Sequence, residues 1–407
     1  MFSIKIAGKE LISFGRDASN VSITGKEILK LLGGGAQTDA GISISEENSL
    51  TYSAVYAAVR CISESLAMLP LQIYQKTDKG REQLTDHRLS YAISNQPNNF
   101  QTSYQFRETL TTHQCLWGNA YAYIIRDRAD RIVQLIPLHP SRVYPYFDEK
   151  LLRVFYVVDS KQIIEQSDML HFPALSLDGI IGKSPIRLAR ENIGLSMATQ
   201  KFGARFFGNG ANPDVVMEHP GKLGDKAIEH LRSSWLNRHG GIEKSHNLAI
   251  LEEGMKMNKL SIPPEESQFL QTRQFQVVEV ARWFRVQPHM IADLSRSTFS
   301  NIEAQDIGFI KYTLLPWLKR WEQQLNMKLL TEDEKSGGAY WEFNQEALLR
   351  GDVKTRTEYY SKMRTIGAMN ANEIRQKENM NLREDEGGNS YDNPNTSRPT
   401  NNDKAKE

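Results

Sequence analysis

Two long helical segments that bracket a compact mixed segment are the feature that most constrains this fold. The first is predicted over residues 185–207, where Ser184 suits the N-cap and Pro185 the first helical position. The second is predicted over 264–286 and has nearly the same length. Between them, DVVMEHP, NLAILEEG and MKMNKL are typical of strands, and LGDKAIEHLRSSWLNRHGG is typical of a helix. We therefore expect an antiparallel helix pair with a small α/β domain at its far end.

The segment before the helix pair, residues 50–174, is predicted to be an α+β domain. Five apolar residues recur at steps of four and three on one face of a helix that Pro70 ends: Val55, Val59, Ile62, Leu66 and Leu69. A second helix is expected over 103–116. The predicted strands are LQIYQ, NAYAYIIRD, RIVQLIPL, RVYPYF, LLRVFYVVD and DMLHFP. Strands and turns at this spacing indicate antiparallel sheet packed on helices.

The segment after the helix pair is predicted to return to that domain. Pro288 breaks the second helix, and a third is expected to begin at a capping box of Ser300 and Glu303. This helix should reach about Leu330 and kink at Pro316. The sequence YWEFN, residues 340–344, is predicted as a strand that rejoins the first sheet.

Both ends of the chain show weak patterning. Residues 1–49 hold few large apolar groups and are expected to form a flexible arm. A helix is predicted over 352–366, and a shorter one should start at the capping box of Asn370 and Glu373. Residues 384–407 lack aliphatic side chains and are expected to be disordered.

The charge balance argues against a dedicated nucleic-acid binding protein. The 407 residues carry 50 Lys and Arg against 49 Asp and Glu, a net charge of +1. Because neutralised phosphates supply much of the affinity for nucleic acid, contacts with DNA should be weak or confined to local patches. Cys61 and Cys115 lie outside any CxxC motif and are expected to be buried free thiols in a reducing compartment. We find no secretory signal and no run of residues that could span a membrane.

The motif DGIIGKSPI, residues 178–186, looks like the end of a P-loop, the turn that holds nucleotide phosphates. A full P-loop needs a glycine five residues before its Gly-Lys pair, but Leu177 holds that place and Gly179 is too close. Pro185 also removes an N–H donor at the helix start. We therefore expect an ordinary helix-entry loop and no ATP-driven motor.

No other motif supports catalysis, a cofactor or a metal. The chain has no HExxH, CxxC or GxSxG sequence, so no catalytic residue or metal ligand is predicted. His139 and His171 are interpreted as structural residues at strand ends. Trp317 and Trp321 lie four apart on a helix and are expected to pack in the core or against another subunit rather than to stack on bases.

The helix pair carries charges that allow two interpretations. The first helix holds Arg187, Arg190, Lys201 and Arg205 against Glu191, and the second holds Glu265, Glu266 and Glu279. These charges form either a solvated face or one half of an intersubunit charge set, which would fix register more than affinity.

Several longer segments together resemble the portal proteins of tailed double-stranded DNA bacteriophages, of the siphophage type. SAVYAAVRCISESLAMLPL, FRETLTTHQCLWGNAYAYIIRD and LIPLHPSRV are similar to the wing region of that family. SLDGIIGKSPIRLARENIGLSMATQKFGARFFGNGANPDVVMEHPGKL, LEEGMK, RSTFSNIEAQDIGFIKYTLLPWLKRWEQQLN and LLRGDVKTR follow in the family's order. The resemblance runs from Leu50 to Asn381. It implies an α+β portal fold with a sheet-containing wing, a helical stem, a small α/β clip, a long kinked helix and a short helical crown.

The resemblance also implies a division of the chain. Between the flexible arm 1–49 and the disordered tail 384–407 we expect the first part of the wing at 50–174, a loop and the first stem helix at 175–213, the clip at 214–262, the second stem helix at 263–287, a tunnel loop at 288–300, the long kinked helix and returning wing strand at 301–351, and crown helices at 352–383.

By the same resemblance, the chain is expected to be a non-enzymatic portal protein without cofactors. It would form a dodecameric ring at the capsid vertex of the virion and pass double-stranded DNA non-specifically during packaging and ejection. The clip would dock the terminase large subunit and later the head–tail adaptor, and the ring would contact the major capsid protein or scaffold. Assembly is expected in the host bacterial cytoplasm, without a membrane. The alternative is a monomeric or lower-order structural adaptor or scaffold in head assembly.

Two groups of residues are expected to carry these contacts. The tunnel loop is expected to place Leu294, Ser295, Arg296, Ser297, Thr298 and Phe299 at the DNA channel, and the clip is expected to dock its partners through Lys226, Glu229, Arg232, Trp235 and Arg238. Arg296 either approaches the channel and meets phosphates weakly or forms a salt bridge with a neighbouring subunit.

Overall fold

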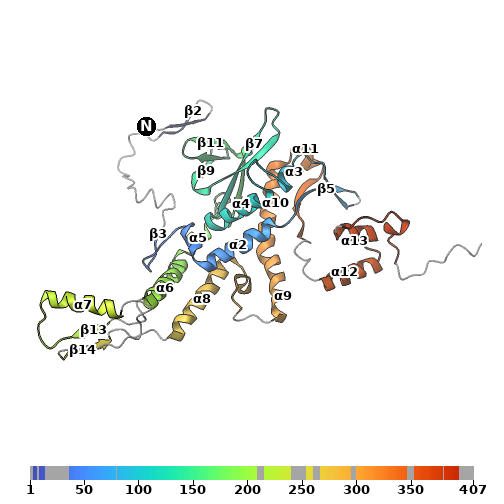
Figure 1. The fold of residues 1–407 in the computed structure, drawn as a ribbon. Coiled ribbons are helices and arrows are strands. Elements are labelled where there is room, and N and C mark those ends of the chain that lie inside the picture. The colour runs from blue at the N-terminus through green and yellow to red at the C-terminus, as the bar shows by residue number, and fades with distance from the viewer. Residues whose placement is uncertain are drawn as a thin grey trace, which may run out of the picture. The chain divides into compact units, whose positions relative to one another are not determined.

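The chain folds into a mixture of helices and antiparallel sheets, which confirms the α+β class (Figure 1). The computed structural model describes residues 3–6, 9–13, 36–78, 80–208, 215–239, 254–259, 266–294, 299–345, 353–378 and 380–393. Two compact units can be separated. The first comprises Met1–Met68 and Gln72–Glu342, and the second comprises Leu69–Leu71 and Phe343–Glu407.

A three-stranded antiparallel sheet and two helices form the centre of the first unit. The sheet has the order β12-β7-β8, with β7 at Asn119–Arg126, β8 at Ile132–Leu138 and β12 at Met169–Pro173. Helix α4 (Ser103–Trp117) contacts β7, and α2 (Ser53–Ala67) packs on α4. The apolar stripe predicted for α2 is confirmed, because Val55, Val59, Ile62, Leu66 and the following Leu69 are all buried.

Two further small sheets complete this body. The first has the order β11-β10-β9, with β9 at Val143–Asp148, β10 at Arg153–Val158 and β11 at Gln162–Glu165. Its core is shared with β7 and β12 and consists of Tyr121, Val143, Tyr156, Val158, Ile164 and Met169. The second has the order β15-β5-β6, with β5 at Leu71–Thr77, β6 at Gly80–Gln83 and β15 at Ala339–Phe343. The strand predicted at 340–344 therefore rejoins the sheet region next to β5.

The third long helix is interrupted where the kink was predicted. Helix α9 (Phe299–Gly308) is followed by a π-helical turn at Phe309–Leu314 and then by α10 (Leu315–Leu329). Pro316 cannot donate a backbone hydrogen bond to the preceding turn, and the wider π turn absorbs this defect. Helix α10 contacts β12, where the Trp321 ring stacks on Phe172 with centroids 4.1 Å apart. Trp321 is therefore a core residue, as expected.

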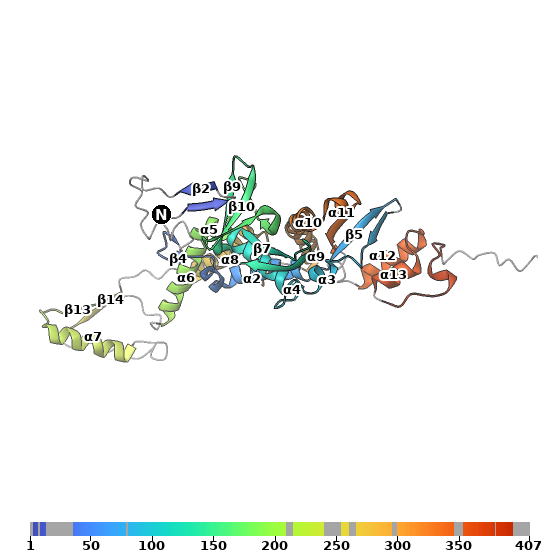
Figure 2. The same ribbon diagram turned by 90° about the horizontal axis from the view of Figure 1, so that it is seen from above.

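The predicted helix pair is present, with one difference. Its first helix bends at Ala189, so that α5 (Pro185–Leu188) precedes α6 (Arg190–Gly208). Helix α8 (Glu266–Phe284) lies beside α6 in both views (Figures 1 and 2). Between them come β13 (Val215–Glu218), α7 (Asp225–His239) and β14 (Lys256–Lys259), and β13 pairs antiparallel with β14. The strand predicted for NLAILEEG falls almost wholly outside the described residues.

Part of the predicted flexible arm is folded. Strands β3 (Ala36–Gln37) and β4 (Ser43–Ile44) form a short hairpin, and a 3₁₀ turn follows at Asn48–Thr51. Thr38, Ile44, Glu46 and Ser49 are buried, and β4 contacts α6. The expectation of an arm that is flexible up to residue 49 is therefore wrong for residues 36–49, which we call the strap.

The second unit holds the two predicted helices and part of the predicted tail. Helix α12 is Val353–Thr365, and α13 (Ala371–Lys377) begins at the predicted capping box of Asn370 and Glu373. The Tyr391 hydroxyl lies 2.6 Å from the Glu373 carboxylate, and the Asn372 side chain lies 2.9 Å from that of Asn389. The tail is therefore ordered on α13 as far as residue 393, which corrects the expectation of disorder there; residues 394–407 are outside the description.

The remaining short elements are β1 (Ser3–Ile6) and β2 (Lys9–Ser13), which pair antiparallel, and helices α3 (Ser90–Ser94) and α11 (Glu332–Ser336). Strands β1 and β2 also lie in the segment that was expected to be a flexible arm.

Candidate functional site: the entry to the helix pair

The loop that resembles a P-loop uses its own N–H groups internally. The Asp178 Oδ1 atom accepts hydrogen bonds from the backbone N–H groups of Ile180 and Ile181, both at 2.8 Å, and these bonds lower the pKa of Asp178 to about 2. The N–H of Lys183 donates to the Leu175 carbonyl at 2.8 Å. A phosphate site at a helix entry needs free N–H donors. These donors are occupied, which supports the expectation of an ordinary helix-entry loop.

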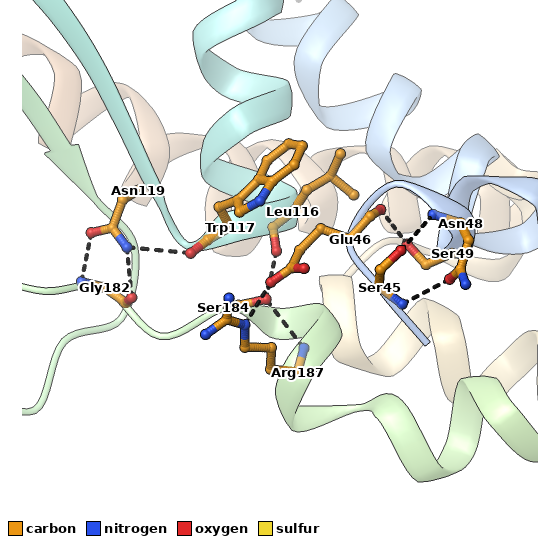
Figure 3. Close-up of polar contacts among 10 residues, drawn as sticks. All are labelled: Ser45, Glu46, Asn48, Ser49, Leu116, Trp117, Asn119, Gly182, Ser184 and Arg187. Atoms are coloured by element: carbon orange, nitrogen blue, oxygen red, sulfur yellow. Dashed lines mark hydrogen bonds and ion pairs between the residues drawn. The ribbon is translucent and has the colours of Figure 1, made fainter. Parts of the chain in front are cut away.

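Two glycines allow this loop to touch the start of β7. A Cβ atom on Gly182 would lie 1.9 Å from the Gly118 carbonyl oxygen, and one on Gly118 would lie 2.3 Å from the Lys183 carbonyl oxygen. Asn119 locks the contact, because its Oδ1 accepts the Gly182 N–H and its Nδ2 donates to the Gly182 carbonyl, both at 2.8 Å (Figure 3). The glycine of the GKS sequence therefore serves close backbone packing.

His171 supports Asn119 from the sheet. Its Nε2 lies 3.0 Å from the Asn119 Oδ1, and its Nδ1 lies 3.2 Å from the Tyr156 hydroxyl. Burial lowers the pKa of His171 to about 3, so the ring is neutral. With Nε2 as the donor and Nδ1 as the acceptor, both partners are satisfied. The structural role expected for His171 is confirmed, and His139 likewise bonds locally, to the Ser141 hydroxyl at 2.7 Å.

The helix entry is capped and tied to the strap. The Ser184 hydroxyl accepts the Arg187 N–H at 3.1 Å, as predicted for an N-cap, and donates to the Leu116 carbonyl at 2.6 Å. The Arg187 Nε then lies 2.6 Å from a Glu46 carboxylate oxygen (Figure 3). The Glu46 side chain is only 5% exposed, so this ion pair is largely shielded on the carboxylate side.

The strap also contacts α6, which follows the bend at Ala189. A Cβ atom on Gly194 of α6 would lie 2.6 Å from the Thr38 side chain, so glycine is what allows the strap to cross the helix there. The Asp39 N–H donates to Glu191 at 3.0 Å. The strap is thus bonded to α5 through Glu46 and to α6 through Asp39. Sequence reasoning missed this contact, although Gly194 inside a predicted helix was an available signal.

The buried side of the helix pair is polar as well as apolar. The Ser196 hydroxyl on α6 donates to the Gln276 Oε1 on α8 at 2.9 Å, in a fully buried contact. Burial raises the pKa of Tyr52, whose hydroxyl is also bonded to Ser196. Because a buried hydroxyl or amide left unpaired is costly, this contact fixes the register of the two helices.

The first helix of the pair carries exposed apolar side chains. Leu188, Leu195 and Phe202, spaced by seven residues, are 55%, 47% and 51% exposed. Lys201 and Arg205 beside them are exposed and have no charged partner among the described residues. We call these five residues the outer stripe. Leu195 and Phe202 share one face of α6, with the spacing of a face that packs on another helix, and Leu188 precedes the bend on α5.

The other predicted charges of the helix pair have partners within the chain. Arg187 binds Glu46, Arg190 lies 3.5 Å from Glu191, and Glu279 forms an ion pair with Arg282. Glu265 and the side chain of Glu266 lie outside the description. Among the residues that the structure describes, Lys201 and Arg205 are thus the predicted charges of the helix pair that remain available for a contact with another subunit.

The predicted contact residues are only partly described. Leu294 is exposed and Phe299 is the first residue of α9, whereas Ser295, Arg296, Ser297 and Thr298 fall outside the described residues. All five clip residues lie on α7. Lys226 and Glu229 are exposed, and the side chains of Arg232, Trp235 and Arg238 are outside the description. The assignments to a channel and to partner docking therefore stay predictions.

The described part of the chain offers little else for chemistry. It contains no group of three or more His, Cys, Asp or Glu side chains that could hold a metal ion. None of its helices is both long and apolar enough to cross a membrane. Cys115 is buried and Cys61 is half-buried, and burial raises the pKa of the Cys61 thiol to about 11. A cavity of about 520 Å³ lies between α2 and α4, with Arg60, Glu64, Glu108 and His113 in its lining.

The chain combines a sheet-rich body, a helix pair with a small α/β insert and a long helix interrupted by a π turn. The profile of the family described as "Phage portal protein" matches residues 53–379. The chain therefore belongs to the phage portal protein family.

Two curated relatives agree with this assignment. The chain is 35% identical over 361 residues to a "Probable portal protein" of Streptomyces phage phiC31, a match that covers 85% of this chain and 78% of the relative. It is 31% identical over 344 residues to the "Portal protein" of Enterobacteria phage HK97, covering 83% and 81%.

Solved structures share the fold. An HK97 family phage portal protein from Corynebacterium diphtheriae superposes with a TM-score of 0.58 at 15% identity, covering 76% of this chain and 99% of that one. A chain in the virion of a native gene transfer agent particle gives a TM-score of 0.57 at 19% identity, covering 88% and 99%.

Proposed function

We propose that twelve copies of this chain form a ring at the capsid vertex and that the ring is a conduit for double-stranded DNA. The observation that carries ring formation is the outer stripe, because three half-exposed apolar side chains along α5 and α6 are expected to be covered by a partner. A second copy of this chain fits, since a structurally similar chain occurs in the neck of a gene transfer agent particle computed with C12 symmetry.

The chemistry of the chain suits passage of DNA rather than tight binding. The net charge is +1, so a ring surface would hold few unbalanced cations to retain phosphates. We propose that Leu294 to Phe299 line the channel and that Arg296 meets phosphates weakly. We propose that this contact with DNA is non-specific, because contacts to phosphates carry no sequence information directly.

The energy for DNA movement is proposed to come from a separate motor. The loop with the GKS sequence has its N–H donors occupied, which supports a non-enzymatic role for this chain. We propose that α7, through Lys226, Glu229, Arg232, Trp235 and Arg238, docks the terminase large subunit during packaging and the head–tail adaptor afterwards. The major capsid protein or scaffold would contact the ring in the virion, after assembly in the host bacterial cytoplasm.

Substitution of Arg296 tests the channel assignment. In an infection complemented with Arg296→Ala, we expect rings of normal mass and a reduced amount of packaged DNA. Loss of ring assembly would instead show that Arg296 forms an intersubunit salt bridge, and unchanged packaging would remove Arg296 from the channel. Arg128→Ala is the matched control, since Arg128 is exposed in the turn between β7 and β8, outside the segments proposed for the channel and for docking.

A monomeric or lower-order structural adaptor is the second candidate. The folded strap and the ordered tail on α13 give one chain extended surfaces that could bind partners without a ring. The mass of the purified protein decides between the two candidates.

A further inference from the structure

His289 joins the two chain segments that flank residues 295–298. It lies in a 3₁₀ turn at Pro288–Ile291, which follows α8, whereas α9 begins at Phe299. Its Nδ1 is 2.8 Å from the Gln305 Oε1, and its Nε2 is 2.9 Å from the Asp306 Oδ1. The imidazole is only 9% exposed, whereas the Asp306 side chain is 49% exposed, so the contact is shielded from water on the imidazole side. One side chain thus holds two consecutive residues of α9.

The turn that carries His289 is itself fixed to the body. It contacts α2, where the Cys61 thiol lies 3.9 Å from the Met290 sulfur, and Ile291 is buried. Ala292 ends the turn with φ of +66°, a left-handed conformation that is costly for a residue with a Cβ. Such a conformation persists only where the surrounding contacts fix it. The backbone at Ala292 therefore holds a defined conformation at the end of the turn.

The two partners of His289 define which hydrogen-bonding groups its imidazole must supply. The Nε2–H of the imidazole can donate to the Asp306 carboxylate, and Nδ1 meets the Gln305 amide, whose oxygen and nitrogen exchange places when the side chain flips. A ring of similar shape without nitrogens would leave the Gln305 amide and the Asp306 carboxylate unpaired at this contact. Because the bonds go to adjacent residues of α9, they fix the rotation of that helix about its axis as well as its distance from the turn.

We propose that His289 is a positioning residue for α9, acting as a two-bond clasp that fixes this helix on the turn at Pro288–Ile291. The proposal rests on the proposed function in one respect, since that function assigns residues 294–299, which connect the turn to α9, to the DNA channel. The clasp itself concerns only contacts within one chain.

Hydrogen–deuterium exchange on the purified full-length protein tests the clasp. In His289→Ala and in His289→Phe, which keeps a planar ring, amide exchange in residues 292–294 and 299–308 should rise about ten-fold or more, as expected for the loss of a hydrogen bond to a charged group. Exchange in α2 and α10 should stay as in the wild type. His230→Ala is the matched control, because His230 is exposed on α7.

A charge exchange gives the sharper result. His289→Asp and Asp306→His should each open the clasp, and the combined variant should return exchange in 299–308 to within about three-fold of the wild type, because the hydrogen bond between a His ring and a carboxylate is restored in reverse. Unchanged exchange in His289→Phe, a rise that extends equally to α2 and α10, or no rescue in the combined variant would each overturn the proposal. Hydrogen–deuterium exchange reports on contacts within each chain. A protein that forms no rings would therefore refute the proposed function, but it would not produce any of the exchange results that overturn the clasp.

Discussion

Gly182 approaches Gly118 so closely that a Cβ on Gly182 would lie 1.9 Å from the Gly118 carbonyl oxygen. The GKS sequence therefore marks a packing contact between the helix-entry loop and the start of β7. This contact, the Ser184 cap and the strap together determine how α5 leaves the sheet body.

Gly182→Ala should destabilise the protein by about 3 kcal/mol, because the new methyl group would overlap a backbone oxygen that β7 and Asn119 hold in place. The free energy of unfolding in urea measures this effect. Gly224→Ala is the control, since nothing lies within 4 Å of a Cβ at that position. Equal stability of the two variants would show that the loop can move away from β7.

Lys183→Ala should leave the mass of the oligomer that the purified protein forms unchanged. Neither the wild type nor the variant should bind ATP, because the N–H donors of this loop are used internally. Lys183 is exposed and the loop offers it no phosphate cradle. Fluorescent ATP titration of the wild type and the variant checks this. A saturable signal that disappears in Lys183→Ala would mean that the motif is a nucleotide site.

Arg187→Ala should cost about 2 kcal/mol of stability, because it leaves the buried Glu46 carboxylate without its partner. Glu46→Gln should cost less, since a neutral amide is easier to bury, and the double variant should cost less than the sum of the two. Arg190→Ala is the matched control, because its contact with Glu191 is exposed. Additive effects of Arg187→Ala and Glu46→Gln would argue that the two side chains act independently.

Acidification should weaken the fold through His171. Its pKa is about 3 in the folded chain, mainly because of burial, against about 6.5 for an unfolded chain. The unfolded state therefore takes up a proton that the folded state resists. The stabilising effect is fully present above about pH 6.5 and is lost as the pH falls toward 3.

The pKa of His113, lowered to about 4, acts with the same sign. Thermal unfolding between pH 7 and 4.5 should show a smaller decline in His171→Gln than in the wild type. An identical decline would show that other groups control acid stability.

Leu195→Glu combined with Phe202→Glu should prevent ring formation while leaving the monomer folded, because both side chains are about half exposed in one chain. Tyr144→Glu is the control, since Tyr144 is exposed on β9, away from the outer stripe. Mass photometry with circular dichroism checks both points. Rings of normal mass in the double variant would place the subunit contact elsewhere.

Local patterns predicted much of this fold. The stripe of α2, the cap at Ser184 and the capping box at Asn370 depend on neighbouring residues, and they were read from the sequence with bounds close to those observed. The bend at Ala189 and the folded strap depend on contacts between residues far apart, such as Thr38 with Gly194. Gly194 inside a predicted helix was a local signal of a close approach, but no local pattern identifies its partner.

The candidate site divides in the same way. Spacing and Pro185 argue against a P-loop in the sequence, but the partner of Gly182 is visible only in three dimensions. The outer stripe was not recognised, since Leu188 precedes the bend and only the structure shows which face is exposed. The tunnel and clip residues rest on family resemblance, because their function depends on other chains.

The mass of the purified full-length protein at nanomolar concentration tests the central claim most directly. Mass photometry should show one dominant species of about a dozen 46.4 kDa chains. A single species at the mass of one chain, which persists at higher protein concentration, would contradict the ring and favour a monomeric adaptor.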